Sequence, residues 1–332
     1  MTTSRLTWVI GGSGLLGQHV QAAAARPFRG PSVPWSDREA TKSALRQGIQ
    51  RLLRAADGDT WDIAWCAGAG VVGSSREHFE TERAVFASFL DDLADLADLA
   101  EPAGGDRAGA VFFASSAGGV YAGSSGPPFT ESSDPRARSA YGEAKLAMEA
   151  ALADFAETAQ TPCLVGRIGN LYGPGQNLDK AQGLVSQICR THLTGQPLLL
   201  YVPLDTMRDY IFAPDCAAMI VAGLAGLREQ VAGQRDGGRV VTKIMASGRS
   251  TTIAGLLGES ARLFRRRPRV VVGASAAATG QVHDLRLHSI RWPELDRLTR
   301  TPLPVGLAAT ATDVGRYLRE VRPVPLARGH QH

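Results

Sequence analysis

The sequence predicts an α/β protein with a doubly wound parallel sheet and a smaller C-terminal lobe. Short apolar runs, suited to strands buried on both faces, alternate with longer segments of helical periodicity through the first half of the chain. A glycine-rich turn joins the first of these strands to the first helix. With 332 residues the chain can bury a large core and also build a second region. We therefore expect one domain over residues 1–175, to which residues 203–225 return, and a lobe built mainly from residues 176–332.

The first strand, Arg5–Ile10, runs into the glycine-rich turn, and a helix is expected from Gln18 to Ala25. Three glycines are spaced three apart in this turn. The first permits a tight turn, the second lets the backbone approach a pyrophosphate, and the third lets the helix pack close to the strand. Amides at the start of the helix would point at the anion. The predicted ligand is NAD or NADP, and the residues expected to bind it here are Gly11, Gly14, Leu15, Leu16 and Gly17.

The second strand is expected at Pro31–Trp35, and Asp37 and Arg38 follow it. An acid about 20 residues past the glycines normally accepts a hydrogen bond from the adenosine ribose, whereas an arginine there suits the 2′-phosphate of NADP. Because Asp37 and Arg38 are adjacent, both are expected at the cofactor and the sequence does not separate NAD from NADP. A helix is expected over residues 44–56, and residues 39–60 show no third strand.

A further strand at Trp61–Cys66 ends in small residues. Two of these, Ala67 and Gly68, would let the backbone approach the cofactor closely. A long helix is expected over residues 79–100, where aromatic and aliphatic side chains recur at helical intervals. One more strand is expected at Pro162–Ile168, which extends the alternation of strand and helix.

The next strand, Ala110–Ala114, is followed at once by the hydroxyls of Ser115 and Ser116. Tyr141 and Lys145 begin a helical pattern, and because they are four residues apart their side chains leave the same face. A phenol is a poor acid or base at neutral pH, but a nearby ammonium and a cationic nicotinamide ring favour its deprotonated form. A serine at the end of the adjacent strand could then hold a substrate oxygen near the tyrosine.

The alternative interpretation is a surface Tyr-Lys pair on an amphipathic helix. The chain contains 6 Tyr and only 4 Lys among its 36 basic residues, so this spacing is rare by chance. Where a surface charge would suffice, the sequence uses arginine. We therefore favour the catalytic interpretation.

Composition narrows the possible partners and the compartment. The formal net charge of +4 does not require nucleic acid, and the basic cluster Arg262–Arg269 is expected to be a solvated helix end. The four cysteines are far apart and form no C-x-x-C motif, so neither a metal site nor a disulfide framework is predicted. No apolar run of about 18 residues predicts a membrane span, and no signal peptide is recognised. We expect a cytoplasmic protein.

Two later motifs complete the pattern, Arg167–Pro174 and Met207–Asp215. With the glycines, the two serines and the Tyr-x-x-x-Lys pair in this order, the chain resembles the extended short-chain dehydrogenase/reductases. Within them it is most similar to the NAD-dependent epimerase/dehydratase family, which acts on nucleotide sugars. The resemblance implies a Rossmann-type NAD(P)-binding domain followed by a smaller substrate-binding lobe.

The resemblance also implies roles for individual residues. Tyr141 would be the catalytic acid and base, and Lys145 would hold the nicotinamide ribose. A serine would bind the sugar hydroxyl. Asn170 and Arg208 would contact the nucleotide diphosphate of the substrate, in line with arginine as a bidentate phosphate donor.

The chain departs from the family in two places near the serines. Family 4,6-dehydratases have an Asp-Glu pair where this chain has Gly118-Gly119, so the acid that expels water is missing. Counting back from the following valine puts the usual hydroxyl position at Ala117, whereas counting back from Tyr141 puts it at Ser116. We predict Ser116 as the catalytic and substrate-binding serine. Ser115, which is expected at the cofactor, is the alternative.

The predicted function is NAD(P)-dependent 4-epimerisation of a nucleotide sugar by transient oxidation and re-reduction. One alternative is a keto-sugar or carbonyl reductase of the same family, and another is a non-catalytic NAD(P)-binding regulatory protein. Intact Tyr141 and Lys145 weigh against the last alternative. A homodimer is expected through the helices of residues 79–100 and 140–158, which family members commonly pair. The sequence does not distinguish between sugar nucleotides.

Overall fold

The computed structural model describes residues 5–68, 70, 74–100, 109–179, 183–233, 238–273 and 282–321. Within these residues the main sheet is parallel and has six strands in the order β2-β1-β3-β4-β5-β9. The strand order reverses between β1 and β3, and ligands of such sheets bind beyond the carboxyl ends of the strands at that point. The strands are β1 (Leu6–Ile10), β2 (Arg26–Phe28), β3 (Trp61–Trp65), β4 (Gly109–Ser116), β5 (Cys163–Ile168) and β9 (Val240–Met245).

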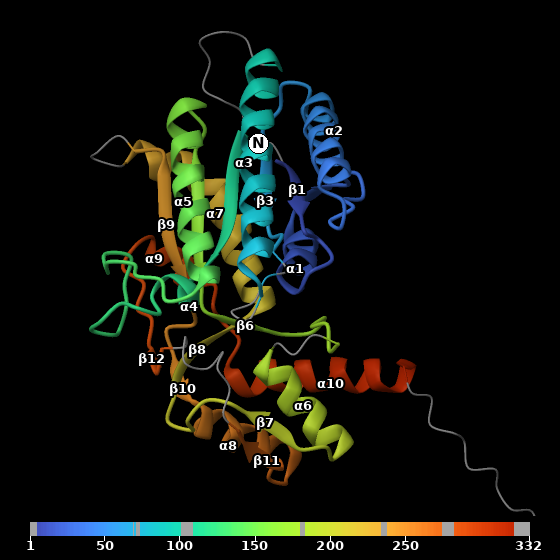
Figure 1. The fold of residues 1–332 in the computed structure, drawn as a ribbon, viewed down its shortest axis with the longest axis vertical. Helices are drawn as coiled ribbons and strands as arrows, with labels where there is room; N and C mark the ends of the chain where they lie inside the picture. The colour runs from blue at the N-terminus through green and yellow to red at the C-terminus, as the bar shows by residue number, and fades with distance from the viewer. Residues whose placement is uncertain are drawn as a thin grey trace, which may run out of the picture.

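Helices cover both faces of this sheet, so the predicted doubly wound fold class is confirmed. Three helices pack against one face and lie side by side in Figure 1: α2 (Arg38–Ala56), α3 (Arg76–Ala100) and α5 (Ala140–Thr158). Two others pack together on the opposite face: α1 (Leu15–Ala23) and α7 (Ala213–Ala232). None of the described helices combines the length and the apolar character that a membrane span requires.

The sequence explains why α3 lies against the sheet. Phe86, Phe89 and Leu93 recur at helical intervals, and all three are buried. The ring centroid of Trp65 on β3 lies 4.9 Å from those of both Phe86 and Phe89, and Phe113 on β4 lies 5.0 Å from Phe86. This aromatic cluster fixes α3 over the centre of the sheet.

The second strand lies earlier than predicted. β2 is Arg26–Phe28, and residues 31–35 form no strand. The two prolines in 31–35 lack the amide hydrogens that a strand ladder needs. Helix α2 also begins earlier than expected, at Arg38, because the carboxylate of Asp37 accepts hydrogen bonds from two amides of its first turn. No strand lies between residues 39 and 60, as expected.

The chain beyond β5 builds most of a second region, which Figure 1 shows beyond the end of the sheet where α5 begins. One apolar core holds its helices together. Residues 203–225 were expected to return to the main sheet; of them, the part in α7 packs against that sheet, whereas β8 pairs with β10 and β12 in a smaller sheet. The later strand β9 is the last strand of the main sheet. The exact division into domains stays a prediction. The additional elements are α4 (Ala117–Val120), β6 (Asn170–Tyr172), α6 (Leu184–Thr194), β7 (Leu198–Leu200), β8 (Met207–Phe212), β10 (Ser250–Thr252), α8 (Ile253–Phe264), β11 (Val270–Val272), β12 (Asp284–Leu285), α9 (Pro293–Asp296) and α10 (Leu303–Val321).

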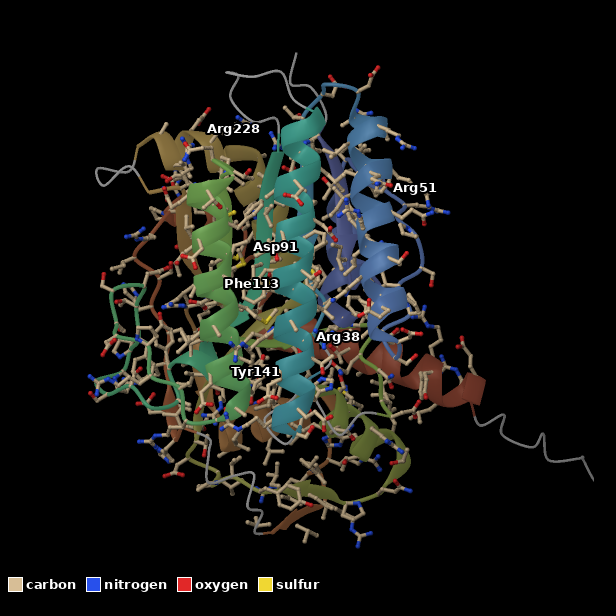
Figure 2. All side chains as sticks on the ribbon, turned by 45° about the horizontal axis from the view of Figure 1, so that its top comes forward. Arg38, Arg51, Asp91, Phe113, Tyr141 and Arg228 are labelled. Atoms are coloured by element: carbon tan, nitrogen blue, oxygen red, sulfur yellow. The ribbon has the colours of Figure 1, made fainter. Side chains whose placement is uncertain are left out.

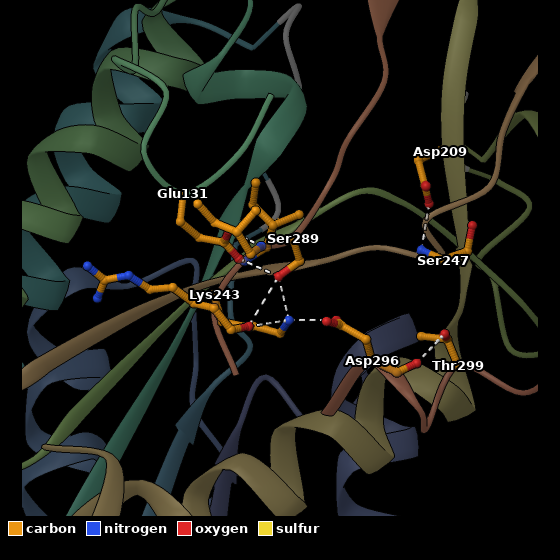
Figure 3. A network of polar contacts seen from close by, with 10 residues as sticks. Glu131, Asp209, Lys243, Ser247, Ser289, Asp296 and Thr299 are labelled. Carbon is orange, nitrogen blue, oxygen red and sulfur yellow. Dashed lines mark hydrogen bonds and ion pairs between the residues drawn. The ribbon is translucent and has the colours of Figure 1, made fainter. Parts of the chain in front are cut away.

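A buried polar network ties β9 to the later part of the chain (Figure 3). The side chain of Lys243 is fully buried, and its Nζ donates to Asp296 Oδ1 at 2.5 Å and to Ser289 Oγ. Glu131 accepts hydrogen bonds from Ser289 Oγ and from the amide of Ile244. A buried ammonium is costly unless it is paired, so these partners fix the segment around Ser289 against the sheet.

Candidate active site

The turn between β1 and α1 has the shape that an anion site needs. Gly11 has φ 84°, in the left-handed region that favours glycine. A Cβ on Gly17 would lie 2.2 Å from the Gly11 carbonyl oxygen, so the helix and the turn touch through backbone alone. Gly14 provides no side-chain cap for α1, so in the described part of the chain the first amides of the helix, at Leu15 and Leu16, receive no side-chain cap from the N-cap residue. Such amides bind phosphates, and the residues present therefore fit the pyrophosphate of a dinucleotide.

A cavity of about 380 Å³ opens beside this turn, between the start of α2 and the first half of α3. Its wall contains Arg38, Ala67 and Gly68, three of the residues predicted to bind the cofactor. Asp37 is not on the described wall, because its carboxylate caps α2 through two amide hydrogen bonds of 3.0 Å each. Other lining residues include Ser13, Trp35, Ser36, Thr41, His78 and Glu82.

Tyr141 and Lys145 lie on one face of the first turns of α5, and Figure 2 shows Tyr141 at the start of that helix. Tyr141 is half-buried, and Lys145 is only 5% exposed. The Lys145 Nζ lies 5.8 Å from the centroid of the Tyr141 ring and 3.4 Å from Glu82 Oε1. A Cβ on Gly68 would lie 2.9 Å from that carboxylate oxygen and 3.3 Å from the ammonium nitrogen. The ammonium therefore sits directly behind the cavity wall, where glycine leaves room for it.

Ser115 belongs to a buried network that joins β4, α5 and β5. It is 4% exposed, and its Oγ donates to Glu149 Oε1. Arg167 donates to both Glu149 oxygens at 2.7–3.2 Å and to the Tyr121 hydroxyl at 2.8 Å. Burial raises the pKa of Tyr121, so its phenol stays protonated and donates to the Thr130 carbonyl. The hydroxyl of Ser115 thus has its partner inside the protein, and Ser115 is not on the described cavity wall.

Ser116 has a different environment. Its Oγ accepts a hydrogen bond of 3.2 Å from the Gly119 amide and so caps the short helix α4. Ser116 is half-buried, whereas Ala117 is fully buried. Of the two positions considered for the hydroxyl, only Ser116 therefore has exposed surface. No hydrogen bond joins Ser116 to Tyr141 within the described ranges of the chain.

A second cavity, of about 570 Å³, lies in the C-terminal region. Asn170 and Arg208, which were predicted to contact the nucleotide diphosphate, both line it from the paired strands β6 and β8. Arg208 is 7% exposed, and burial lowers the pKa of its guanidinium, but an arginine stays protonated in a protein. Arg190 and Tyr201 also line this cavity and were not predicted from the sequence. The structure thus brings two guanidinium groups to one cavity.

Glu82 is a further residue that the sequence prediction missed. The spacing from Phe79 and Phe86 places it on the buried face of α3, where an acidic residue is unusual and could have been noticed. Its Oε1 faces Lys145, and its Oε2 lies 4.0 Å from His78 Nε2. An ion pair of these residues therefore forms part of the cavity wall.

A parallel sheet that reverses beside β1, a glycine turn at the start of an uncapped helix, and a buried lysine one helical turn from a half-buried tyrosine define a class of Rossmann-fold enzymes. Members of this class bind a nicotinamide dinucleotide. The chain belongs to the NAD dependent epimerase/dehydratase family, whose sequence profile matches residues 7–235. The predicted family and the predicted NAD or NADP cofactor are thereby confirmed.

Curated relatives match shorter parts of the chain. The dTDP-L-rhamnose 4-epimerase of Burkholderia thailandensis is 35% identical over 100 residues, which are 30% of this chain and 28% of the relative. The dTDP-4-dehydro-6-deoxyglucose reductase of Escherichia coli is 31% identical over 114 residues, or 34% of this chain and 36% of the relative. Among solved structures, the UDP-glucose 4-epimerase of Thermotoga maritima has a TM-score of 0.71 at 20% identity, over 94% of this chain and 99% of that one. This last likeness shows the fold.

Proposed function

We propose that the protein is an NAD(P)-dependent 4-epimerase of a nucleotide sugar. The Tyr141 phenol takes the proton of the C4 hydroxyl as the C4–H hydride leaves, and it returns the proton when the hydride comes back to either face. Lys145 holds the nicotinamide ribose and keeps a positive charge beside the phenol, and Ser116 holds the sugar oxygen. The bound dinucleotide accepts and returns the hydride, so the sugar undergoes no net oxidation.

The observation that carries this proposal is the position of Lys145. Its ammonium is almost fully buried, lies one helical turn from Tyr141, and faces the wall of a cavity that fits a dinucleotide. A pair with only a surface role would leave the ammonium in water, because burying a charge costs free energy unless it is paired. Glu82 supplies the compensating charge.

The second cavity supports a nucleotide sugar as the substrate. Its two guanidinium groups, from Arg190 and Arg208, can donate bidentate hydrogen bonds to phosphate oxygens. The nucleotide-sugar epimerases among the relatives and the solved structures support the same substrate class. Gly118-Gly119 stands where the family's dehydratases have an acidic pair, so elimination of water is not expected.

The test is to incubate the protein with NAD or NADP and a panel of UDP- and dTDP-hexoses, and to follow the sugars by proton NMR. An epimerase converts one sugar into its C4 epimer with the total reduced nicotinamide unchanged. A reductase, which the similarity to the Escherichia coli reductase supports as second candidate, consumes one NAD(P)H for each keto-sugar. Dinucleotide binding without turnover of any sugar would favour the regulatory alternative.

We also propose that the chain works as a homodimer in the cytoplasm, where its four unpaired cysteines would stay reduced. Small residues line a groove between the outer faces of α3 and α5, among them Ala87 and Ala151, and a second pair of helices could pack there. Light scattering at micromolar concentration should give twice the mass of one chain, and Ala87→Arg should reduce it to one. A monomeric parent protein would contradict this proposal.

A further inference from the structure

The cofactor cavity has two ends. In the proposed function, the pyrophosphate of the dinucleotide binds at the glycine turn, and the nicotinamide binds on the side of Lys145. The adenosine half of the dinucleotide would therefore bind at the opposite end of the cavity, whose wall contains Trp35, Ser36 and Arg38. Trp35 is 49% exposed and sits edge-on to Trp65, with ring centroids 6.3 Å apart, so it offers a flat apolar surface to a base.

Asp37, the acidic residue next to Arg38, caps a helix and is not on the described cavity wall. A carboxylate that selects NAD accepts a hydrogen bond from the 2′-hydroxyl of the adenosine ribose. The Asp37 carboxylate instead accepts from the amides of Glu39 and Ala40 and caps α2. Glu39, the next acid along the chain, has an 82% exposed side chain that pairs with Lys42 at 3.7 Å. Neither acid is part of the described cavity wall.

Arg38 differs from these two acids because it lines the cavity. It lies on the cavity wall at the first position of α2, and its side chain is exposed. Among the described residues its guanidinium has no hydrogen bond or ion pair. Figure 2 shows Arg38 at the end of α2 that lies nearest the start of α5, whereas Arg51 lies farther along the same helix. Arg38 is permanently charged and lies on the cavity wall where the adenosine would bind, so it suits an additional phosphate group.

We infer that the site selects NADP(H) over NAD(H), and that Arg38 binds the 2′-phosphate that distinguishes the two. Ser36, on the same wall, supplies a hydroxyl donor beside it. This inference rests on the dinucleotide site of the proposed function and names its preferred ligand. A charge-assisted pair of this kind corresponds to about 10- to 100-fold in affinity.

The test measures dissociation constants for NADPH and NADH by fluorescence titration of the full chain, without any sugar. NADPH should bind at least about 10-fold more tightly than NADH. Arg38→Ala should weaken NADPH binding by about 10- to 100-fold and change NADH binding by less than about 3-fold. The fragments 2′,5′-ADP and 5′-AMP, used as competitors, should show the same pattern. Arg51→Ala, an equal loss of charge on an exposed part of the same helix, should change neither affinity.

Two outcomes would overturn the inference: NADH binding as tightly as NADPH, or Arg38→Ala weakening both dinucleotides equally. Either result would leave the epimerase proposal intact, because both cofactors can carry the hydride. Failure to bind any dinucleotide would instead remove the cofactor site and the proposed function with it. Raising the salt concentration should narrow the preference in the parent protein and have little effect in Arg38→Ala, as expected for a contact between charges.

Discussion

Removing the Glu149 carboxylate should strongly destabilise the protein, although Glu149 touches neither cavity. In Glu149→Ala, the side chain of Arg167, which is 9% exposed, would keep only its contacts with Tyr121 among the polar contacts that the described residues give it. Ser115 would lose its acceptor at the same time. A buried charge would thus be left without its counter-charge inside the junction of β4, α5 and β5.

The size of the effect follows from this geometry. Breaking a buried ion pair by removing one partner costs about 3–5 kcal/mol. Domains are stable by about 5–15 kcal/mol, so the variant should lose about a fifth or more of its free energy of unfolding. With a urea slope of about 2–3 kcal/mol per M, the unfolding midpoint should fall by about 1–2.5 M.

Urea titrations followed by circular dichroism measure this midpoint, and the chain offers a matched control. Glu143 lies on the same helix and pairs with Arg76, but both side chains are more than half exposed. Glu143→Ala should therefore cost less than about 1 kcal/mol. The double variant Glu149→Leu with Arg167→Met should recover most of the loss, because no charge is left buried. A loss below about 1 kcal/mol in Glu149→Ala would refute the assignment of this pair as a buried structural junction.

Three further predictions concern single residues. Ser116→Ala should lower turnover by about 10-fold or more and leave the melting temperature unchanged. Ser115→Ala should instead lower the free energy of unfolding by about 1 kcal/mol and leave turnover close to that of the parent protein. The reverse pattern would show that Ser115, and not Ser116, is the catalytic serine. Glu82→Gln should leave the charge of Lys145 uncompensated, so the acidic limb of the pH–rate profile should move to lower pH, and an unmoved limb would exclude this coupling. Burial lowers the pKa of His192, and the positive charge of Arg266 lowers it further, so the folded protein favours the neutral imidazole. Stability from this residue should be complete above about pH 6.5 and lost as the pH falls, and His192→Gln should flatten the melting temperature between pH 7.5 and 5.5.

The sequence was sufficient for the parts of the fold that depend on strong periodic patterns. The glycine turn, the aromatic spacing of α3 and the position of Tyr141 and Lys145 on one helix face all follow from local spacing. The position of β2 did not, because a three-residue edge strand has too little pattern to stand out beside two prolines.

The side-chain environments of the site could not be read from the sequence, since they depend on contacts between distant segments. Glu149 is 34 residues from Ser115, and Glu82 is 63 residues from Lys145. Asp37 and Arg38 are adjacent in the chain but differ in their surroundings, because one caps α2 and the other lines the cavity. The different roles of these two neighbouring residues therefore follow from the fold and not from the local sequence.

The most direct test of the proposed mechanism is turnover by Tyr141→Phe on the sugar nucleotide that the parent enzyme converts. The substitution keeps the ring beside Phe79 and deletes the one group proposed to move the proton. Turnover should fall by about 10²–10⁴-fold, while the dissociation constant for the dinucleotide and the melting temperature stay at the parent values. A Tyr141→Phe enzyme that keeps most of its activity would contradict the central claim that this phenol is the catalytic acid and base.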